Sequence, residues 1–293
     1  MRITNQVMAN VTIYNINQIR KRLYAAQTDL ASGTRLHRPS DSPPDVVETM
    51  RLYSSRTRLE RYKTNIADAK ARLEQTDLAL QQLVSVVVRV RELAIQGANA
   101  SSSDLSRNAS AEEVERLLEA AVDIANSQYA GKYLFAGTAS DAPAFSIAGG
   151  VVTYNGNSDK IYREIAPNIR VEVNVTGDQL INLNLFGILK DVADHLRAGD
   201  LNALSGPDLA ALNQLEDGLL GLVTQLGARQ RSVELAENRA MELTYTLEAH
   251  ITQTEGIDFE ATLLRFNQEE LAYKTALGVT ARILPPSLLD FLR

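Results

Sequence analysis

The chain has 293 residues, and 45% of them are hydrophobic, so it can bury one large core or about two to three smaller ones. Aromatic residues make up only 5%, with no Trp, which leaves the core to aliphatic residues as in helical bundles. A net charge of −6 argues against a dedicated nucleic-acid binder, and the absence of cysteine excludes disulfides and thiolate metal sites.

The first helix is expected over about residues 6–32. Five of its apolar residues recur at heptad spacing: Ile16, Ile19, Leu23, Ala26 and Leu30. Gly33 follows them and is suited to end the helix. The first 40 residues are mostly basic, with Asp29 as the single acid, and charge complementarity with acidic neighbours in an assembly is the preferred interpretation.

A second helix is expected to begin after a proline-rich loop and to run to about residue 100. Ser42 is a suitable N-cap, Pro43 fits the first helical position, and Asp45 completes a spacing similar to a capping box. The core-facing positions follow one heptad grid: Leu52, Leu59, Ile66, Leu73, Leu80, Val87 and Ala94, with Tyr62, Ala69, Thr76, Leu83, Val90 and Gly97. So long a seam favours coiled-coil packing and points to assembly before chemistry.

Ser110 and Glu113 form a capping box that is expected to open a third helix, ending near Ala130. Gly, Asn and Ser clusters with short β-prone runs follow, and strands are expected at residues 151–154, 161–165 and 169–175. Asn155-Gly156-Asn157 is interpreted as the turn of a hairpin, and Gly149-Gly150 as a further turn.

Helices are expected again over residues 185–196 and, after a break at Gly199, over residues 208–252. The longer of the two carries a second heptad grid: Leu212, Leu215, Leu219, Leu222, Leu226, Val233, Ala236, Ala240, Leu243 and Leu247. A last amphipathic helix is expected after Asp258, with an apolar stripe of Phe259, Leu263, Phe266, Tyr273 and Leu277.

These elements predict a mainly α protein: a long antiparallel coiled-coil bundle formed by the N- and C-terminal thirds, with a small β-rich insert in the middle. Three domains are expected. They are a terminal coiled-coil domain of residues 1–40 and 256–293, a helical rod of residues 41–134 and 185–255, and an outer insert of residues 135–184.

No pattern in the chain predicts catalysis, a cofactor or a metal site. His37, His195 and His250 lack the spacing of a zinc-binding helix, and the glycines match neither a dinucleotide fingerprint nor a phosphate-binding loop. No apolar run approaches the length of a membrane span, and the first residues lack the pattern of a secretory signal. A structural protein without membrane or nucleic-acid partners is therefore expected.

The two terminal helices are expected to supply the assembly interface. Isolated helices are marginal in water, so we expect these two to become ordered when they pack against neighbouring copies. The predicted interface residues are Ile16, Ile19, Leu23, Leu30, Leu263, Phe266, Leu271, Leu277, Leu288 and Leu289.

Several motifs resemble the flagellin family. Residues 30–36, L-A-S-G-T-R-L, are similar to its L-S-S-G-x-R-[IV] segment, and residues 131–138, G-K-Y-L-F-A-G-T, to its G-x-[YF]-[LI]-F-[AG]-G segment. The start M-R-I-T, the loop P-S-D-S-P at residues 39–43 and the S-L-L-D-F-L at residues 287–292 resemble the hook-associated branch of the family. Ser42 replaces the second Asp of that branch's loop motif but can cap a helix equally well.

The resemblance implies a structural subunit of the bacterial flagellum that joins the hook to the filament. Such a subunit would leave the cell unfolded through the flagellar export channel, without a cleaved signal, and act outside the cell. Its copies would form a ring or helical tube between the preceding junction protein on the hook side and flagellin on the filament side, after delivery by an export chaperone. The alternatives are a short flagellin that builds the filament itself, a membrane-associated coiled-coil tether, and an enzyme within the insert.

Overall fold

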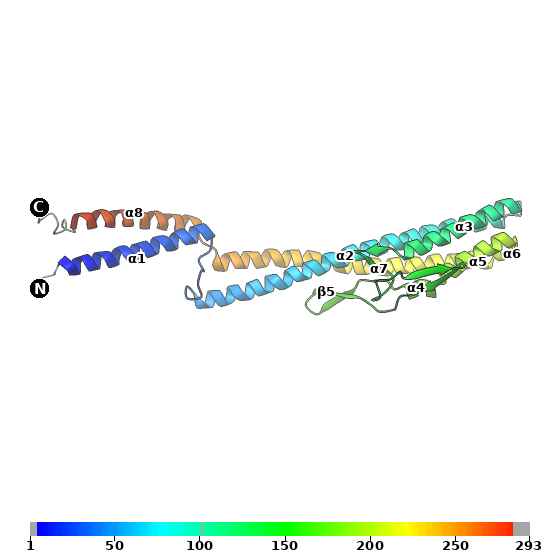
Figure 1. Ribbon diagram of the computed structural model, residues 1–293, viewed down its shortest axis with the longest axis horizontal. Helices are drawn as coiled ribbons and strands as arrows, with labels where there is room; N and C mark the ends of the chain where they lie inside the picture. Colours follow the sequence, from blue (N-terminus) through cyan, green and yellow to red (C-terminus); the bar gives the residue numbers. More distant parts are fainter. Residues whose placement is uncertain (1–4, 101, 284–293) are drawn as a thin grey trace. The chain divides into compact units, whose positions relative to one another are not determined.

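The computed structural model describes residues 5–100 and 102–283, which form helices and short antiparallel strand pairs (Figure 1). The helices are α1 (Asn5–Ser32), α2 (Pro43–Ala98), α3 (Asp104–Ala125), α4 (Gly177–Asn182), α5 (Leu185–Ala198), α6 (Leu201–Ser205), α7 (Pro207–Glu255) and α8 (Phe259–Ile283). The strands are β1 (Gln128–Tyr129), β2 (Lys132–Tyr133), β3 (Phe145–Ala148), β4 (Val151–Tyr154), β5 (Tyr162–Ala166) and β6 (Ile169–Glu172). The prediction of a mainly helical chain with a β-rich insert is confirmed.

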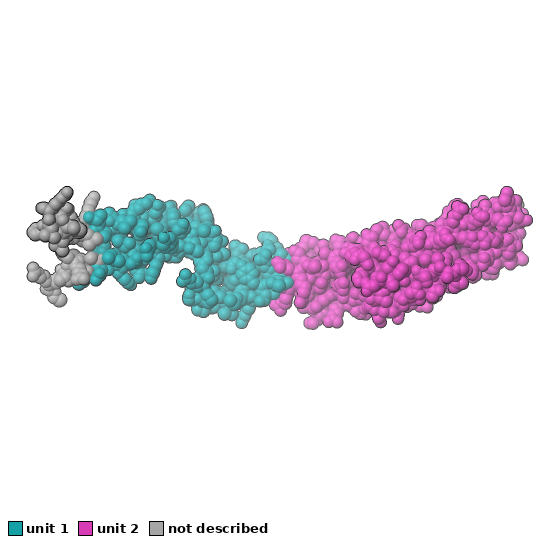
Figure 2. All heavy atoms as spheres, viewed as in Figure 1, with its two compact units in different colours: residues 1–57, 244–293 teal, residues 58–243 magenta. Residues whose placement is uncertain are grey.

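The contacts divide the chain into two units, coloured teal and magenta in Figure 2. The terminal unit comprises residues 1–57 and 244–293, and the central unit comprises residues 58–243. The terminal unit contains α1, α8, the start of α2 and the end of α7, while the remaining elements belong to the central unit.

In the terminal unit, α1 and α8 pack against each other in antiparallel directions (Figure 1). Gly33 ends α1 as predicted, with φ of 71°, a left-handed value that glycine adopts without steric cost. Its carbonyl oxygen accepts a hydrogen bond from Ile257 N at 3.3 Å, and Thr34 forms an antiparallel bridge with Gly256. The end of α1 is thereby fixed beside the start of α8.

The heptad seam of α2 lies at the centre of the core of the central unit. Its positions from Ile66 to Ala94 are at most 1% exposed: Ile66, Leu73, Leu80, Val87 and Ala94 at one grid position, and Ala69, Thr76, Leu83 and Val90 at the other. The matching grid of α7 buries Leu212, Leu215, Leu219, Leu226 and Val233. Two ion pairs, Lys70–Glu237 and Arg91–Glu216, show that α2 and α7 are antiparallel within this unit, which confirms their predicted pairing.

Helix α5 covers the same core and packs against α3. Its buried residues recur every three to four positions, as an amphipathic helix requires: Leu185, Leu189, Val192 and Leu196. Gly199 ends it with φ of 68°, at the break that the sequence predicted.

The prediction for the start and end of α3 is wrong. The helix begins at Asp104, because the side chain of Ser103 accepts a hydrogen bond from Ser106 N at 3.2 Å and supplies the N-cap. Ser110 is instead a buried residue in the interior of the helix, 6% exposed, and the helix ends at Ala125. The residues that follow form the β1–β2 pair, which the sequence analysis missed.

The strand expected at residues 151–154 is present as β4 with the same ends, and the other two expected strands are present as β5 and β6 with shifted ends, but one turn is assigned wrongly. The pairs are β3–β4 and β5–β6, and Gly149 and Gly150 form the turn between β3 and β4 with φ of 59° and 75°. Asn155-Gly156-Asn157 does not connect paired strands. The side chain of Asn157 instead accepts a hydrogen bond from Thr138 N at 2.8 Å, across the insert.

Strand β6 ends at Glu172, earlier than the alternating pattern predicted, and the residues after it bond to the segment that precedes β5. Val173 N donates a hydrogen bond to Ile161 O at 2.9 Å. The fully buried Asn174 accepts one from Ile161 N at 2.7 Å and donates one to Asp159 O at 3.0 Å. These contacts fix the insert to itself, and the short helix α4 that follows was not predicted.

Candidate assembly surface

The predicted interface residues of α1 lie on a helix whose packing partner is α8. All four are half-buried in the described chain: Ile16, Ile19, Leu23 and Leu30. Ala26, on the same heptad grid, is fully buried and allows the two helices to approach closely. This stripe is therefore covered in part by α8 of the same chain, and its outer edge stays accessible.

The predicted residues of α8 are more exposed. Phe266 is half-buried, whereas Leu263, Leu271 and Leu277 are 41%, 67% and 44% exposed. Leu288 and Leu289 lie outside the described residues. The exposed side chains of α8 therefore leave apolar surface that α1 does not cover.

Further apolar residues on both helices are exposed, and the sequence analysis did not single them out as interface residues. They are Val7, Val11, Ile13, Tyr14 and Tyr24 on α1, and Phe259, Leu264 and Val279 on α8. The sequence pattern that could have predicted the exposed residues of α1 is the spacing of Val7, Val11 and Tyr14. These three residues form a second apolar stripe beside the heptad grid. Exposed apolar surface on this scale marks sites of association.

One ion pair sets the register between the two helices. Arg22 Nε lies 2.7 Å from Glu269 Oε1, and the Glu269 side chain is the more buried of the two at 16% exposed. The pair joins a basic residue of the N-terminal segment to an acid on α8, so part of the predicted charge complementarity is satisfied within the chain.

The loop between α1 and α2 is held by Arg35, the arginine of the L-A-S-G-T-R-L segment. Arg35 Nη2 donates hydrogen bonds to Asp45 Oδ2 at 2.7 Å and to Thr254 O at 2.6 Å, and its backbone N donates to Glu255 O at 2.8 Å. The hydrogen bond from Arg35, and then that from Ser42, lowers the pKa of Asp45. One side chain thus connects this loop, the first turn of α2 and the last turn of α7.

The same loop contains an aspartate-centred turn. The Asp41 carboxylate accepts hydrogen bonds from the backbone N–H groups of Arg38 at 2.8 Å and His37 at 3.0 Å, and these bonds lower the pKa of Asp41. His37 Nε2 lies 2.9 Å from Asp29 Oδ1. These hydrogen bonds therefore hold the turn of the loop and connect it to the end of α1.

The structure offers no chemical centre among residues 5–100 and 102–283. No group of three or more His, Cys, Asp or Glu side chains in these ranges could hold a metal ion. His195 pairs with Asp208 inside the central unit. Over the same ranges, none of the helices combines the length and the apolar character that crossing a bilayer requires.

Comparisons with known proteins find chains of the bacterial flagellum. The family profile of the bacterial flagellin N-terminal helical region matches residues 3–140. The flagellar hook-associated protein 3 of Escherichia coli (strain K12) is 20% identical over 94% of this chain and 95% of its own length. A flagellin of Halalkalibacterium halodurans is also 20% identical, over 95% of this chain and 93% of its own.

A solved structure has the same fold. It is that of a Vibrio parahaemolyticus protein described as a flagellar hook-associated protein, with a TM-score of 0.68 and 21% identity over 74% of this chain and all of the solved one. The long helices, the terminal apolar faces and these similarities lead to one conclusion. Residues 3–140 match the flagellin N-terminal helical region, and the chain as a whole is similar to structural proteins of the bacterial flagellum.

Proposed function

We propose that this chain is the subunit that joins the flagellar hook to the filament. The observation that carries the proposal is the apolar surface that α1 and α8 leave exposed after packing on each other, with Leu271 67% and Leu264 63% exposed. Such surface is costly in a solitary molecule and becomes favourable when neighbouring copies cover it, at about 25 cal/mol per Å² of apolar area. The relatives named as hook-associated proteins support the junction rather than another flagellar position.

The proposed division of labour follows three parts of the chain. Residues 1–40 and 256–293 would form an inner coiled-coil layer, residues 41–134 and 185–255 a helical rod, and residues 135–184 an outer insert. The exposed residues of α1 and α8 support an inner layer made by contacts between copies. We further propose that both helices become fully ordered in the assembly, since copies supply the burial that a two-helix contact lacks.

The mechanism is packing, without catalysis or a cofactor. Each apolar side chain that becomes fully buried between copies contributes about 1.5–3 kcal/mol. Many such contacts around a ring or helical tube transmit bending and torque from one segment to the next. The proposed neighbours are the preceding junction protein on the hook side and flagellin on the filament side. An export chaperone would deliver the chain to the extracellular flagellum.

The alternative is a short flagellin that builds the filament itself, which the near full-length similarity to a flagellin keeps open. Antibody labelling of isolated flagella separates the two functions. A junction subunit labels a short zone at the hook end of each filament, whereas a flagellin labels the whole length. Label along the whole length, or purified chain that polymerises alone into long filaments, would overturn the junction proposal.

A further inference from the structure

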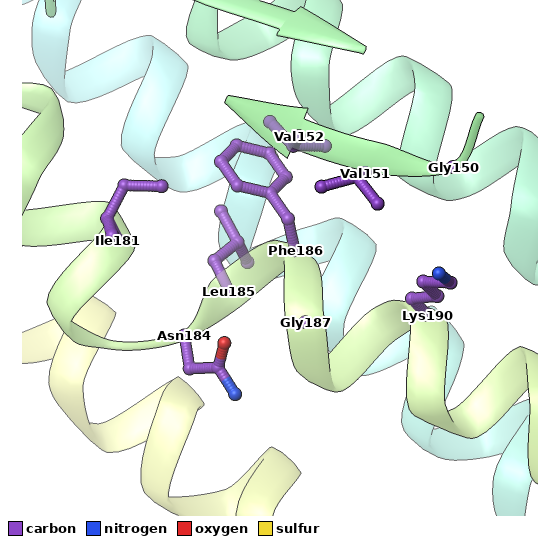
Figure 3. A pocket seen from close by; sticks show the side chains of 9 residues that line it. All are labelled: Gly150, Val151, Val152, Ile181, Asn184, Leu185, Phe186, Gly187 and Lys190. Carbon is purple, nitrogen blue, oxygen red and sulfur yellow. The ribbon is translucent and has the colours of Figure 1, made fainter. Parts of the chain in front are cut away.

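A cleft of about 220 Å³ opens in the central unit between the β3–β4 hairpin and the start of α5 (Figure 3). Its walls include Val151, Val152, Ile181 and Phe186, so most of the lining is apolar. The volume is below the range of about 300–1,000 Å³ that is typical of small-molecule sites. It suits one or two side chains of another protein better than a cofactor.

One positive charge borders this apolar cleft. Lys190 lies on α5 at the rim beside Gly150, and among the described residues no carboxylate is paired with it. Val151 on the hairpin is 57% exposed and Ile181 at the end of α4 is 39% exposed, so apolar surface continues out of the cleft. The occupant that fits this arrangement is an apolar side chain next to a carboxylate.

The chain carries such a pair at the first turn of α3. Leu105 is 82% exposed, the highest value among the large apolar side chains that the structure describes. The neighbouring Asp104 side chain is 90% exposed, although it also pairs with Arg107. A leucine this exposed gains more from burial than one already half covered, at about 25 cal/mol per Å².

We propose that Asp104 and Leu105 of one copy dock into this cleft on a second copy, with Leu105 against Val151 and Phe186 and Asp104 paired with Lys190. This contact joins two different surfaces of the same unit, so it is heterologous and repeats from copy to copy. A heterologous contact builds a ring or a tube, whereas a self-complementary one stops at a dimer. The inference rests on the proposed function, because it needs copies that lie side by side.

The experiment uses the absence of cysteine from the chain, which makes every disulfide an introduced one. Leu105→Cys and Val151→Cys are combined in one full-length chain, and flagella isolated from cells that carry it are oxidised and run on a non-reducing gel. Both positions are exposed, so the fold tolerates the changes. A disulfide forms only between two cysteines whose Cα atoms lie within about 7 Å of each other. We expect a ladder of cross-linked multimers of this chain.

Three controls complete the design. Leu105→Cys alone and Val151→Cys alone give no ladder, because one cysteine per chain links two copies at most. Leu235→Cys with Val151→Cys gives no ladder either, although Leu235 on α7 is 70% exposed. Asp104→Lys and Lys190→Glu, each added to the cysteine pair, weaken the ladder, and the two together restore it.

The possible results are separable. The cleft contact is overturned if the chain with Leu105→Cys and Val151→Cys is present in the flagella but forms no ladder. It is also overturned if the chain with Leu235→Cys and Val151→Cys forms as much ladder. Neither result contradicts the junction function. A chain that is absent from the flagella even without substitutions overturns the proposed function itself. Charge variants that leave the ladder unchanged overturn the pairing of Asp104 with Lys190.

Discussion

Leu196 of α5 occupies the space where a side chain on Gly97 of α2 would begin. A Cβ atom added to Gly97 would overlap Leu196 Cδ2 and lie 3.7 Å from Leu204 Cδ1. Both leucines are completely buried, so neither can move away freely. Helices α2 and α5 can approach each other at this point because the side chain of Gly97, at this heptad position, is only a hydrogen atom.

Gly97→Ala is therefore expected to destabilise the central unit. Alanine improves helix propensity by about 0.5–1 kcal/mol, but overpacking a filled core costs about 1–3 kcal/mol, so the net change in the free energy of unfolding is a loss. Chemical denaturation followed by circular dichroism measures it. Gly221→Ala on α7, where no atom lies within 4 Å of the added Cβ, is the matched control and should stabilise the chain.

The heptad seam makes a second prediction within a single helix. Leu80 of α2 is completely buried, whereas Leu78, two residues earlier, is 51% exposed. Leu80→Ala should lower the free energy of unfolding by about 2–5 kcal/mol, because it leaves a cavity in the core. Leu78→Ala should change it by less than about 0.5 kcal/mol. Similar losses from both substitutions would show that the seam does not face the core.

A pH dependence follows from the pair between α5 and α7. His195 Nδ1 lies 2.8 Å from Asp208 Oδ2, and the hydrogen bond with Asp208 raises the pKa of His195 above its ordinary value of 6.5, helped by the charges of Asp200 and Asp191. A raised pKa stabilises the fold below the ordinary value, and this stability is lost as the pH rises through the pKa of the folded state.

His195→Gln isolates this effect, because the other histidines are unchanged in the variant. The native chain should have the higher Tm at a pH just below 6.5, and the difference should shrink as the pH rises. Thermal unfolding at several pH values measures it. A difference that grows with pH would contradict the assignment of a charged His195 at low pH.

Replacing Arg72, unlike the core and His195 substitutions above, is not expected to lower the free energy of unfolding. It is 6% exposed, and among the described residues no hydrogen-bond partner reaches its Nε and Nη2 atoms. Burial, and then the positive charge of Arg163, lowers the pKa of Arg72. Arg72→Met should leave the free energy of unfolding unchanged or raise it, since replacing a buried charge by an apolar side chain is often favourable.

Arg163→Met is the matched control for Arg72→Met. Arg163 Nε pairs with Asp68 Oδ2 at 2.7 Å, so this variant loses an ion pair and should be slightly less stable. A clear loss of stability for Arg72→Met would show that its guanidinium has a partner that stabilises the fold.

Periodicity predicted the helices well because it depends on residues close in the sequence. The grid of α2 and the N-terminal Pro43 of that helix were both located from the sequence, as was the glycine that ends α5. The start of α3 was missed because two capping patterns compete there. Ser103 provides the cap, and Ser110 lies in the interior of the helix.

Features that depend on distant residues could not be predicted in the same way. The hydrogen bond of Asn157 with Thr138 and the pair of His195 with Asp208 join segments whose meeting only the fold determines. A heptad grid also does not predict whether its apolar residues are covered by the same chain or by another copy. On α8 the grid contains both the half-buried Phe266 and the exposed Leu263.

The most direct test of the account is the amount of Leu271→Asp chain in isolated flagella. Leu271 is 67% exposed, so the folded subunit should tolerate the charge, and the helical content by circular dichroism should be unchanged. Incorporation should fall by about tenfold or more, because a contact worth about 1.5–3 kcal/mol per copy is lost. Leu23→Asp should have the same effect, while Leu235→Asp on the equally exposed Leu235 should assemble normally. Normal incorporation of the Leu271→Asp and Leu23→Asp chains would contradict assembly through the terminal helices.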